Sequence, residues 1–241
     1  MALEESFDQE NKKLYDFLTE KGACILFEEN SGIPCWRVQT CYKISAPTNI
    51  PDPAAMAHEL LHVKLNLMGF TDDIYTYSHF NVRNSPFSIE FIGHMNNDLG
   101  HFKMLDEFLT MGYSVDEFLQ DTPKDYFLGG MFMKVVVLQT LNNAGTIDLC
   151  KEILGIIQLI SGAKLFELYK IKDPSTENGL HPDLILSPLK EINNELTSEI
   201  ENLFQQWQVS DTLNNLWFYA NLDAILKKYG IVNFNDCYGI K

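Results

Sequence analysis

The order of apolar and polar residues along the chain predicts helices over most of its length. Residues 6–21 follow an amphipathic helical period that ends before Gly22, a residue type suited to the end of a helix. Residues 54–68 also follow a helical period, and Asp52 and Pro53 are residue types preferred at the N-cap and the first position of a helix. This second helix is apolar on nearly every side, so we expect it to be buried.

Two segments between these helices are richer in β-branched and aromatic residues. Residues 23–29 and 33–44 have this composition, and the sequence Asn30-Ser31-Gly32 between them is typical of a hairpin turn. Residues 73–82 alternate in character, which predicts a further strand or an extended loop. The amino-terminal half is therefore expected to contain a small sheet.

Helical periods dominate from residue 87 onward. Ser114 and Glu117 form a capping box that predicts the start of a short helix. The predicted fold class is α+β, with an amino-terminal domain of residues 1–120 and a mainly helical half of residues 121–241 that packs on it or forms a second domain. The predicted helices of this part of the chain are 87–111, 115–120, 123–141, 146–161, 163–170, 188–207 and 211–228.

Acidic residues outnumber basic ones, which gives a formal net charge of −15 in 241 residues. No cluster of lysine and arginine offers a surface for phosphates, so nucleic-acid binding is not expected. No run of residues reaches the about 18 consecutive apolar positions of a membrane span. The first residues also lack the basic and apolar regions of a secretory signal. Neither a nucleic acid nor a membrane is therefore an expected partner.

Five cysteines are scattered along the chain and form no Cys-x-x-Cys pair. A cysteine zinc site is therefore not expected. Reduced thiols in a cytosol are the simplest interpretation, and they predict a cytoplasmic protein.

The clearest chemical signal is the sequence His58-Glu59-Leu60-Leu61-His62, which fits the pattern His-Glu-x-x-His. Side chains at positions i and i+4 lie on one face of a helix, about 5–6 Å apart at Cβ. Two imidazoles at this spacing can bind one Zn²⁺ at about 2.0–2.1 Å each. Glu59 lies to the side of the pair, where its carboxylate can take a proton from a metal-bound water.

The apolar context of the motif favours a metal site over a chance match. Ionisable side chains on a buried helix are costly unless they have partners, whereas a random match would lie on a polar helix. A metal-free helical scaffold that carries the pattern by chance is the alternative.

The stretch of about residues 20–112 resembles the zincin superfamily of metallopeptidases, through its strand pair and the motif helix. The resemblance implies a small sheet beside that helix and one zinc ion per chain. It also implies that the two histidines are ligands and the glutamate is the general base. Metzincins continue the motif with a glycine and a third histidine, where this chain has Leu65 and Met68. A gluzincin-like protein or a short bacterial-type relative is therefore the nearer resemblance.

A third ligand is expected from residues 87–111, where polar residues recur on one side of the helix. His94 and His101 are about 10 Å apart along its axis, so only one of them can bind the same ion. We favour His101, which would complete a three-histidine site with one position left for water. Asp98 and Glu90 stay open as alternative third ligands or as groups that orient a ligand. The other interpretation is a solvated helix face. The polar positions are Glu90, His94, Asn97, Asp98 and His101.

Tyr75, Tyr77 and His79 alternate directly after the motif helix, so in an extended segment they would share one side. One of them could stabilise the oxyanion that forms when water attacks an amide carbonyl, or contact the substrate. The alternative is that these side chains belong to the core.

These signals predict a zinc-dependent hydrolase that cleaves peptide or amide bonds by metal-activated water, with a peptide or a protein as substrate. The alternative is a non-catalytic regulatory or binding protein with a structural or vestigial metal site. In that case the helical carboxy-terminal half would bind a protein partner.

Overall fold

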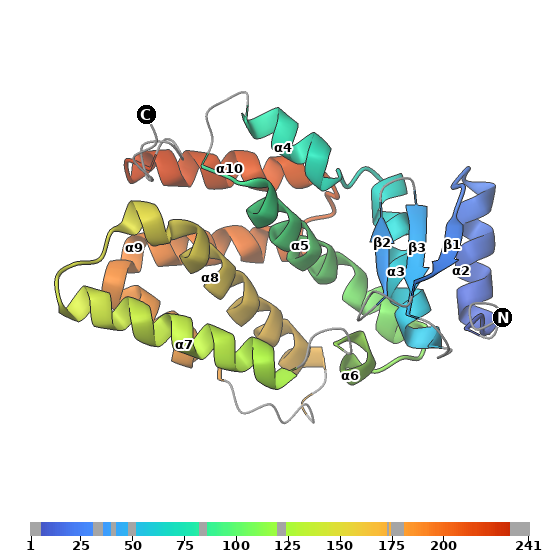
Figure 1. The fold of residues 1–241 in the computed structure, drawn as a ribbon, viewed down its shortest axis with the longest axis horizontal. Coiled ribbons are helices and arrows are strands. Elements are labelled where there is room, and N and C mark those ends of the chain that lie inside the picture. Colours follow the sequence, from blue (N-terminus) through green and yellow to red (C-terminus); the bar gives the residue numbers. More distant parts are fainter. Residues whose placement is uncertain are drawn as a thin grey trace. The chain divides into compact units, whose positions relative to one another are not determined.

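The computed structural model of this chain describes residues 6–30, 36–39, 42–47, 52–81, 86–119, 124–172, 174 and 181–231. The chain forms two compact units. The first comprises Met1–Phe70 with Lys103–Pro123, and the second comprises Thr71–Phe102 with Lys124–Lys241. Both units are mainly helical, and the strands described lie in the first (Figure 1). The α+β prediction therefore holds in its coarse form.

The first unit contains a three-stranded sheet in the order β1-β3-β2. Strand β1 (Leu26–Glu29) pairs in parallel with β3 (Lys43–Ala46), and β2 (Arg37–Gln39) pairs antiparallel with β3. The predicted hairpin between residues 23–29 and 33–44 is therefore wrong. The second predicted segment is split into two strands that pair with each other, and Tyr42 between them has a positive φ of 57°. Residues 31 and 32 of the predicted turn lie outside the described residues.

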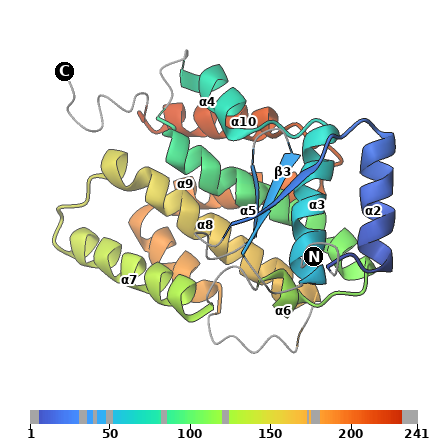
Figure 2. The same cartoon turned by 45° about the vertical axis from the view of Figure 1, so that its right-hand side comes forward.

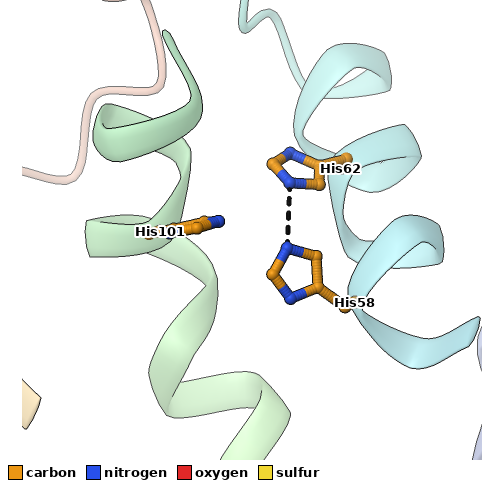
Figure 3. A group of neighbouring side chains, drawn as sticks. All are labelled: His58, His62 and His101. Carbon is orange, nitrogen blue, oxygen red and sulfur yellow. Dashed lines mark hydrogen bonds between the residues drawn. The ribbon is translucent and has the colours of Figure 1, made fainter. Parts of the chain in front are cut away.

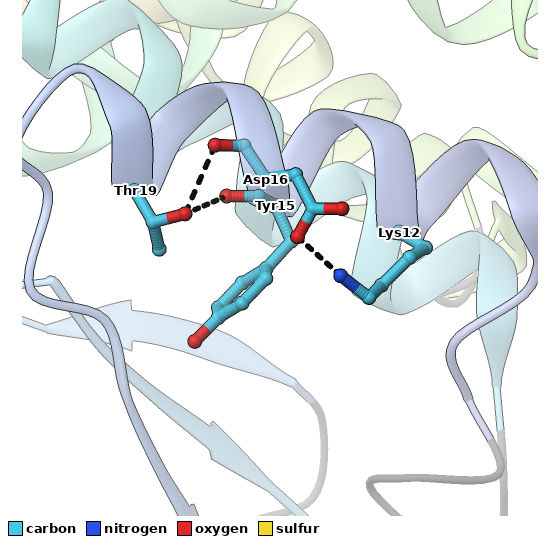
Figure 4. A network of polar contacts seen from close by, with 4 residues as sticks. All are labelled: Lys12, Tyr15, Asp16 and Thr19. Atoms are coloured by element: carbon cyan, nitrogen blue, oxygen red, sulfur yellow. Dashed lines mark hydrogen bonds and ion pairs between the residues drawn. The ribbon is translucent and has the colours of Figure 1, made fainter.

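Helix α2 (Gln9–Glu20) packs against α3 (Pro53–Leu67), and aromatic side chains of α2 and of the residues before it contact strand β1. The Tyr15 and Phe7 rings lie 5.9 and 5.6 Å from the ring of Phe27 on β1. On the outer side of the helix, Lys12 pairs with Asp16 one turn later (Figure 4). The amphipathic pattern of this segment is confirmed, with Asn11, Leu14 and Leu18 as the buried positions of the helix.

Helix α3 (Pro53–Leu67) carries the His-Glu-x-x-His motif and packs against α2, β2 and α6 (Val115–Phe118). The Asp52 side chain accepts a hydrogen bond from the backbone N–H of Ala55 at 2.9 Å, so the predicted N-cap is present. The buried Asn11 side chain donates to the carbonyl of Pro53 at 2.8 Å, which ties α2 to the start of α3. Met56, Ala57, Leu60 and Val63 have no exposed surface, as the all-round apolar pattern predicts.

The second unit is built around α9 (Asp183–Val209), which packs against α7 (Lys124–Asn143), α8 (Leu149–Lys172) and α10 (Asn215–Lys228). Figures 1 and 2 show α9 running beside α7 and α8. Residues 149–172 form one helix where two were predicted, because the Ser161-Gly162 pair lies buried within it and does not break it. The core of the unit contains Trp207, Phe204, Phe218 and Tyr219, all fully buried.

Residues 71–102 belong to the second unit because their backbone is hydrogen-bonded by its buried side chains. Trp207 donates to the carbonyl of Leu99 at 3.0 Å, and Tyr219 donates to the carbonyl of Ile92 at 3.2 Å. Both carbonyls lie on α5 (Ile89–Thr110), which is one uninterrupted helix. The two units therefore do not follow the division at residue 120 that the sequence predicted.

The prediction of a strand or extended loop at 73–82 is wrong, because Asp73–Asn81 form helix α4. Asp72 precedes the helix and accepts a hydrogen bond from the N–H of Tyr75 at 2.7 Å, as a capping residue does. Thr76 and Phe80, one turn apart, are the buried positions. The burial thus follows a helical period and not the alternation seen in the sequence.

Two further expectations concern cysteines and membranes. Cys150 is disulfide-bonded, so the expectation of five reduced thiols is wrong, whereas Cys24 is free. No helix among the described residues is both long and apolar enough to cross a membrane.

Replacing Asp52 with alanine tests the capping of the motif helix. The variant loses the hydrogen bond to the N–H of Ala55, and we expect the free energy of unfolding to fall by about 1 kcal/mol. Urea denaturation followed by circular dichroism measures this change. Asp52→Asn is the control, because asparagine caps equally well; an equal loss in both variants would contradict the assigned role.

Candidate metal centre

His58 and His62 face each other from successive turns of α3. Their Nε2 atoms are 3.2 Å apart and their ring centroids 5.0 Å apart (Figure 3). Two nitrogens bound to one tetrahedral Zn²⁺ at about 2.05 Å lie about 3.3 Å from each other. The helix therefore holds the two rings at nearly the separation that a shared ion requires. In the absence of an ion, the same distance suits a hydrogen bond in which one ring donates.

Burial keeps the His62 ring in the neutral form, which can bind a metal. Loss of hydration disfavours the charged imidazolium and lowers the pKa of His62 from 6.5 to about 4. His58 is only 6% exposed. A neutral ring retains a nitrogen lone pair, so His62 is available as a ligand at neutral pH.

His101 on α5 completes a group of three histidines. Each histidine offers a ring nitrogen, and these nitrogens all lie within 4.8 Å of one another. Figure 3 shows the ring of His101 directed from α5 toward the pair on α3. Helix α5 is continuous, and from Lys103 onward its residues belong to the unit that holds α3. His101 is the residue that the sequence analysis favoured as third ligand, and the three residues could hold a metal ion.

Aromatic side chains from the first unit enclose His58. The Phe118 ring lies 4.7 Å from the His58 ring, and the Phe108 ring lies 6.4 Å from it. Phe118 ends α6, whose start is fixed by the predicted capping box between Ser114 and Glu117. The Phe118 ring at the end of this short helix therefore covers one side of the His58 ring and keeps water from it.

Glu59 is buried beside the histidines, with 4% of its surface exposed. Among the described residues, its carboxylate is not part of the group of close ligand atoms. Its place at position i+1 of the motif turns it about 100° around the helix from His58. Glu59 therefore follows His58 in the chain but, among the described residues, is not one of the group that could hold an ion.

A second layer of polar groups comes from α8. The Tyr169 hydroxyl lies 3.5 Å from Nδ1 of His101, and both side chains are buried. The Asp98 carboxylate, one turn before His101, accepts a hydrogen bond from the Ser161 hydroxyl at 2.7 Å. Burial raises the pKa of Asp98 to about 7, and the hydrogen bond from Ser161 partly opposes this rise. Burial and the nearby Asp98 raise the pKa of Tyr169, so its hydroxyl keeps its proton.

The alternative third ligands are not brought into the histidine group. Asp98 is directed at Ser161. Glu90 is exposed in the first turn of α5, about 16 Å along the axis from His101. Because no side chain spans that distance, Glu90 cannot bind the same ion as His101.

The proposed common side of Tyr75, Tyr77 and His79 is wrong, because α4 is helical. In a helix only positions i and i+4 share a face, so Tyr77 lies on another side than Tyr75 and His79. Tyr75 is 57% exposed. Among the described residues, His79 is not part of the histidine group. The alternation of these residues in the sequence therefore does not bring all three to one side of the folded segment.

The sequence analysis did not identify Phe118 or Tyr169 as parts of the site. The capping box predicted the helix that ends at Phe118 but not which residue that helix covers. Tyr169 is 68 residues from His101 and had no motif around it. Contacts of this kind depend on how helices pack, which a local pattern does not specify.

Replacing Asp98 with asparagine tests its raised pKa in the metal-free protein. Between pH 3.8 and about 7, the Asp98 carboxyl keeps its proton in the folded state but loses it in the unfolded chain. The free energy of unfolding therefore falls as the pH rises through this window. We expect Asp98→Asn to gain stability over the wild type across the window, by at most about 1.4 kcal/mol per pH unit, and nothing further above it. Denaturation at several pH values with a chelator present measures the difference.

The exposed Asp211 provides the control for loss of one negative charge. Asp211→Asn should change stability little at every pH. Curves for the wild type and Asp98→Asn that stay parallel between pH 5 and 8 would show that the assigned ionisation is wrong.

Comparisons with protein-family models, with curated proteins and with solved structures find no match to this chain.

Proposed function

We propose that this protein is a zinc-dependent hydrolase that cleaves peptide or amide bonds, with His58, His62 and His101 as the metal ligands. One observation carries the proposal: three histidine nitrogens converge within 4.8 Å. The residue that follows His58 in the motif is the buried Glu59. Three protein ligands with one open position are the arrangement of catalytic zinc sites, whereas structural sites use four protein ligands. The resemblance to zincins supports the same assignment of roles.

The chemistry of the donors favours zinc. Neutral imidazoles suit Zn²⁺, and they also suit Ni²⁺, Cu²⁺ and Fe²⁺. Burial lowers the pKa of His62, so protonation competes less with an ion for the nitrogen of this ring. When bound, such an ion lowers the pKa of a coordinated water toward about 7 and polarises the carbonyl of the substrate.

Glu59 supplies the proton transfers in this proposal. Its carboxylate accepts a proton from the attacking water and then donates this proton to the nitrogen that leaves when the amide bond breaks. A residue in this role must lie beside the ligands without binding the ion itself. Glu59 meets this requirement, since it is buried next to His58 and outside the group of close ligand atoms.

Zinc binding is the first consequence to measure. Protein purified without a histidine tag should bind one zinc ion per chain, and His62→Ala should bind at least 100-fold more weakly, because two ligands do not hold the ion as three do. His94→Ala is the matched control: this histidine lies on α5 but is exposed and outside the group. Titration against a chromophoric chelator gives both affinities.

Equal losses in His62→Ala and His94→Ala, or no zinc uptake by the wild type, would contradict the proposed centre. A large loss of melting temperature on chelation, without any hydrolytic activity, would instead indicate a structural ion.

Glu59→Gln separates catalysis from metal binding. The variant should keep its zinc but lose about 100-fold or more in hydrolysis, because glutamine cannot carry the proton from water to the leaving nitrogen. Cleavage of a quenched fluorescent peptide library, followed for the zinc-loaded proteins, measures the activity. Glu90→Gln is the control, since it makes the same substitution at an exposed position of α5. Full activity in Glu59→Gln would show that the general-base assignment is wrong.

A further inference from the structure

Tyr169 contacts the His101 ring at its Nδ1 atom. Its hydroxyl lies 3.5 Å from Nδ1, which is longer than the about 2.7–3.2 Å usual for a hydrogen bond between N–H and oxygen. Tyr169 is 3% exposed and His101 is 9% exposed, so water has little access to this contact. The residue comes from α8, an element outside the stretch that resembles zincins.

A hydrogen-bond partner at one nitrogen of an imidazole determines whether the other nitrogen can bind a metal. A neutral ring has one N–H and one nitrogen with a lone pair, and only the second can bind a metal. Metal-bound histidines almost always donate the remaining N–H to an acceptor, which fixes both the tautomer and the direction of the ring. A hydroxyl oxygen beside Nδ1 is such an acceptor.

We infer that Tyr169 is a positioning residue for the metal centre: its hydroxyl oxygen accepts a hydrogen bond from Nδ1 of His101 and thereby keeps the lone pair on Nε2, the nitrogen that would bind the ion. The inference rests on the proposed function, because it assigns a purpose to a contact with one of the proposed ligands. It goes beyond that proposal by adding a residue of the carboxy-terminal helices to the centre.

The Tyr169 hydroxyl can donate a hydrogen bond to Nδ1 of His101 or accept one from it. Only acceptance is compatible with an ion bound at Nε2. If Tyr169 donates to Nδ1, the proton of His101 is on Nε2 and this nitrogen cannot bind a metal. If Tyr169 accepts from Nδ1, the lone pair is on Nε2. Binding of an ion therefore selects the second arrangement, and removal of the hydroxyl takes away the group that stabilises it.

Tyr219 offers a matched comparison within the same unit. It is also fully buried and also bonds to α5, by donating to the carbonyl of Ile92 at 3.2 Å and to the side-chain oxygen of Asn96 at 2.9 Å. These partners are not in the histidine group. The two tyrosines thus differ in which part of α5 they hold, and not in their burial or in the helix that they contact.

The test compares Tyr169→Phe with Tyr219→Phe. We expect Tyr169→Phe to weaken zinc binding by about 10- to 100-fold, the usual effect of losing a partner of a metal-bound histidine. Its Co²⁺-loaded form should also show visible absorption bands that differ from those of the wild type. Tyr219→Phe should lower the melting temperature yet leave the zinc affinity and the Co²⁺ spectrum unchanged.

Each outcome bears on the inference. Tyr169→Phe with the affinity and spectrum of the wild type would overturn it while leaving the zinc centre intact. Equal weakening in both variants would also overturn it, because a general loosening of α5 would then explain the effect. If the wild type takes up neither Zn²⁺ nor Co²⁺, the proposed centre itself fails and the role of Tyr169 fails with it.

Discussion

Removal of imidazole rings from water is the physical constraint on which the candidate centre depends. A buried ring resists protonation, so it keeps a lone pair at a pH where an exposed histidine would be partly charged. The lowered pKa of His62 is a result of such burial, and the Phe118 ring contributes to the burial of His58. The apolar residues that make α3 the centre of the first unit therefore also prepare its two histidines to bind an ion.

Helix α5 shows how one element can combine polar positions of different kinds. His94 and Asn97 are exposed, as expected for a solvated face, whereas Asn96 and His101 are buried. Each buried group has a partner from the carboxy-terminal helices: Tyr219 bonds to Asn96, and Tyr169 lies beside His101. Burial of a polar side chain without a hydrogen-bond partner lowers the stability of the fold. The helices that follow residue 124 supply such partners and thereby offset this loss for the buried polar residues of α5.

The sheet and α4 show where local patterns were insufficient. Alternation at 73–82 suggested an extended segment, but the capping by Asp72 and the burial of Thr76 and Phe80 favour a helix. The strand composition at 23–44 was correctly recognised, yet β1 pairs with β3 and not with its nearest neighbour in sequence. Strand pairing depends on which surfaces meet in the folded chain, and a turn signal such as Asn30-Ser31-Gly32 describes only one possible connection.

The sequence by itself determined the local features: the Asp52 cap of α3, the capping box of α6, and the spacing that puts His58 and His62 on one face of a buried helix. These depend on residues within about one turn of each other, and the period of the helix fixes them. Only the tertiary structure decided that His101 and not Glu90 joins the pair, and that Phe118 and Tyr169 lie against the rings. These contacts join residues 39 to 68 positions apart, and they arise from the packing of helices, which no local pattern contains.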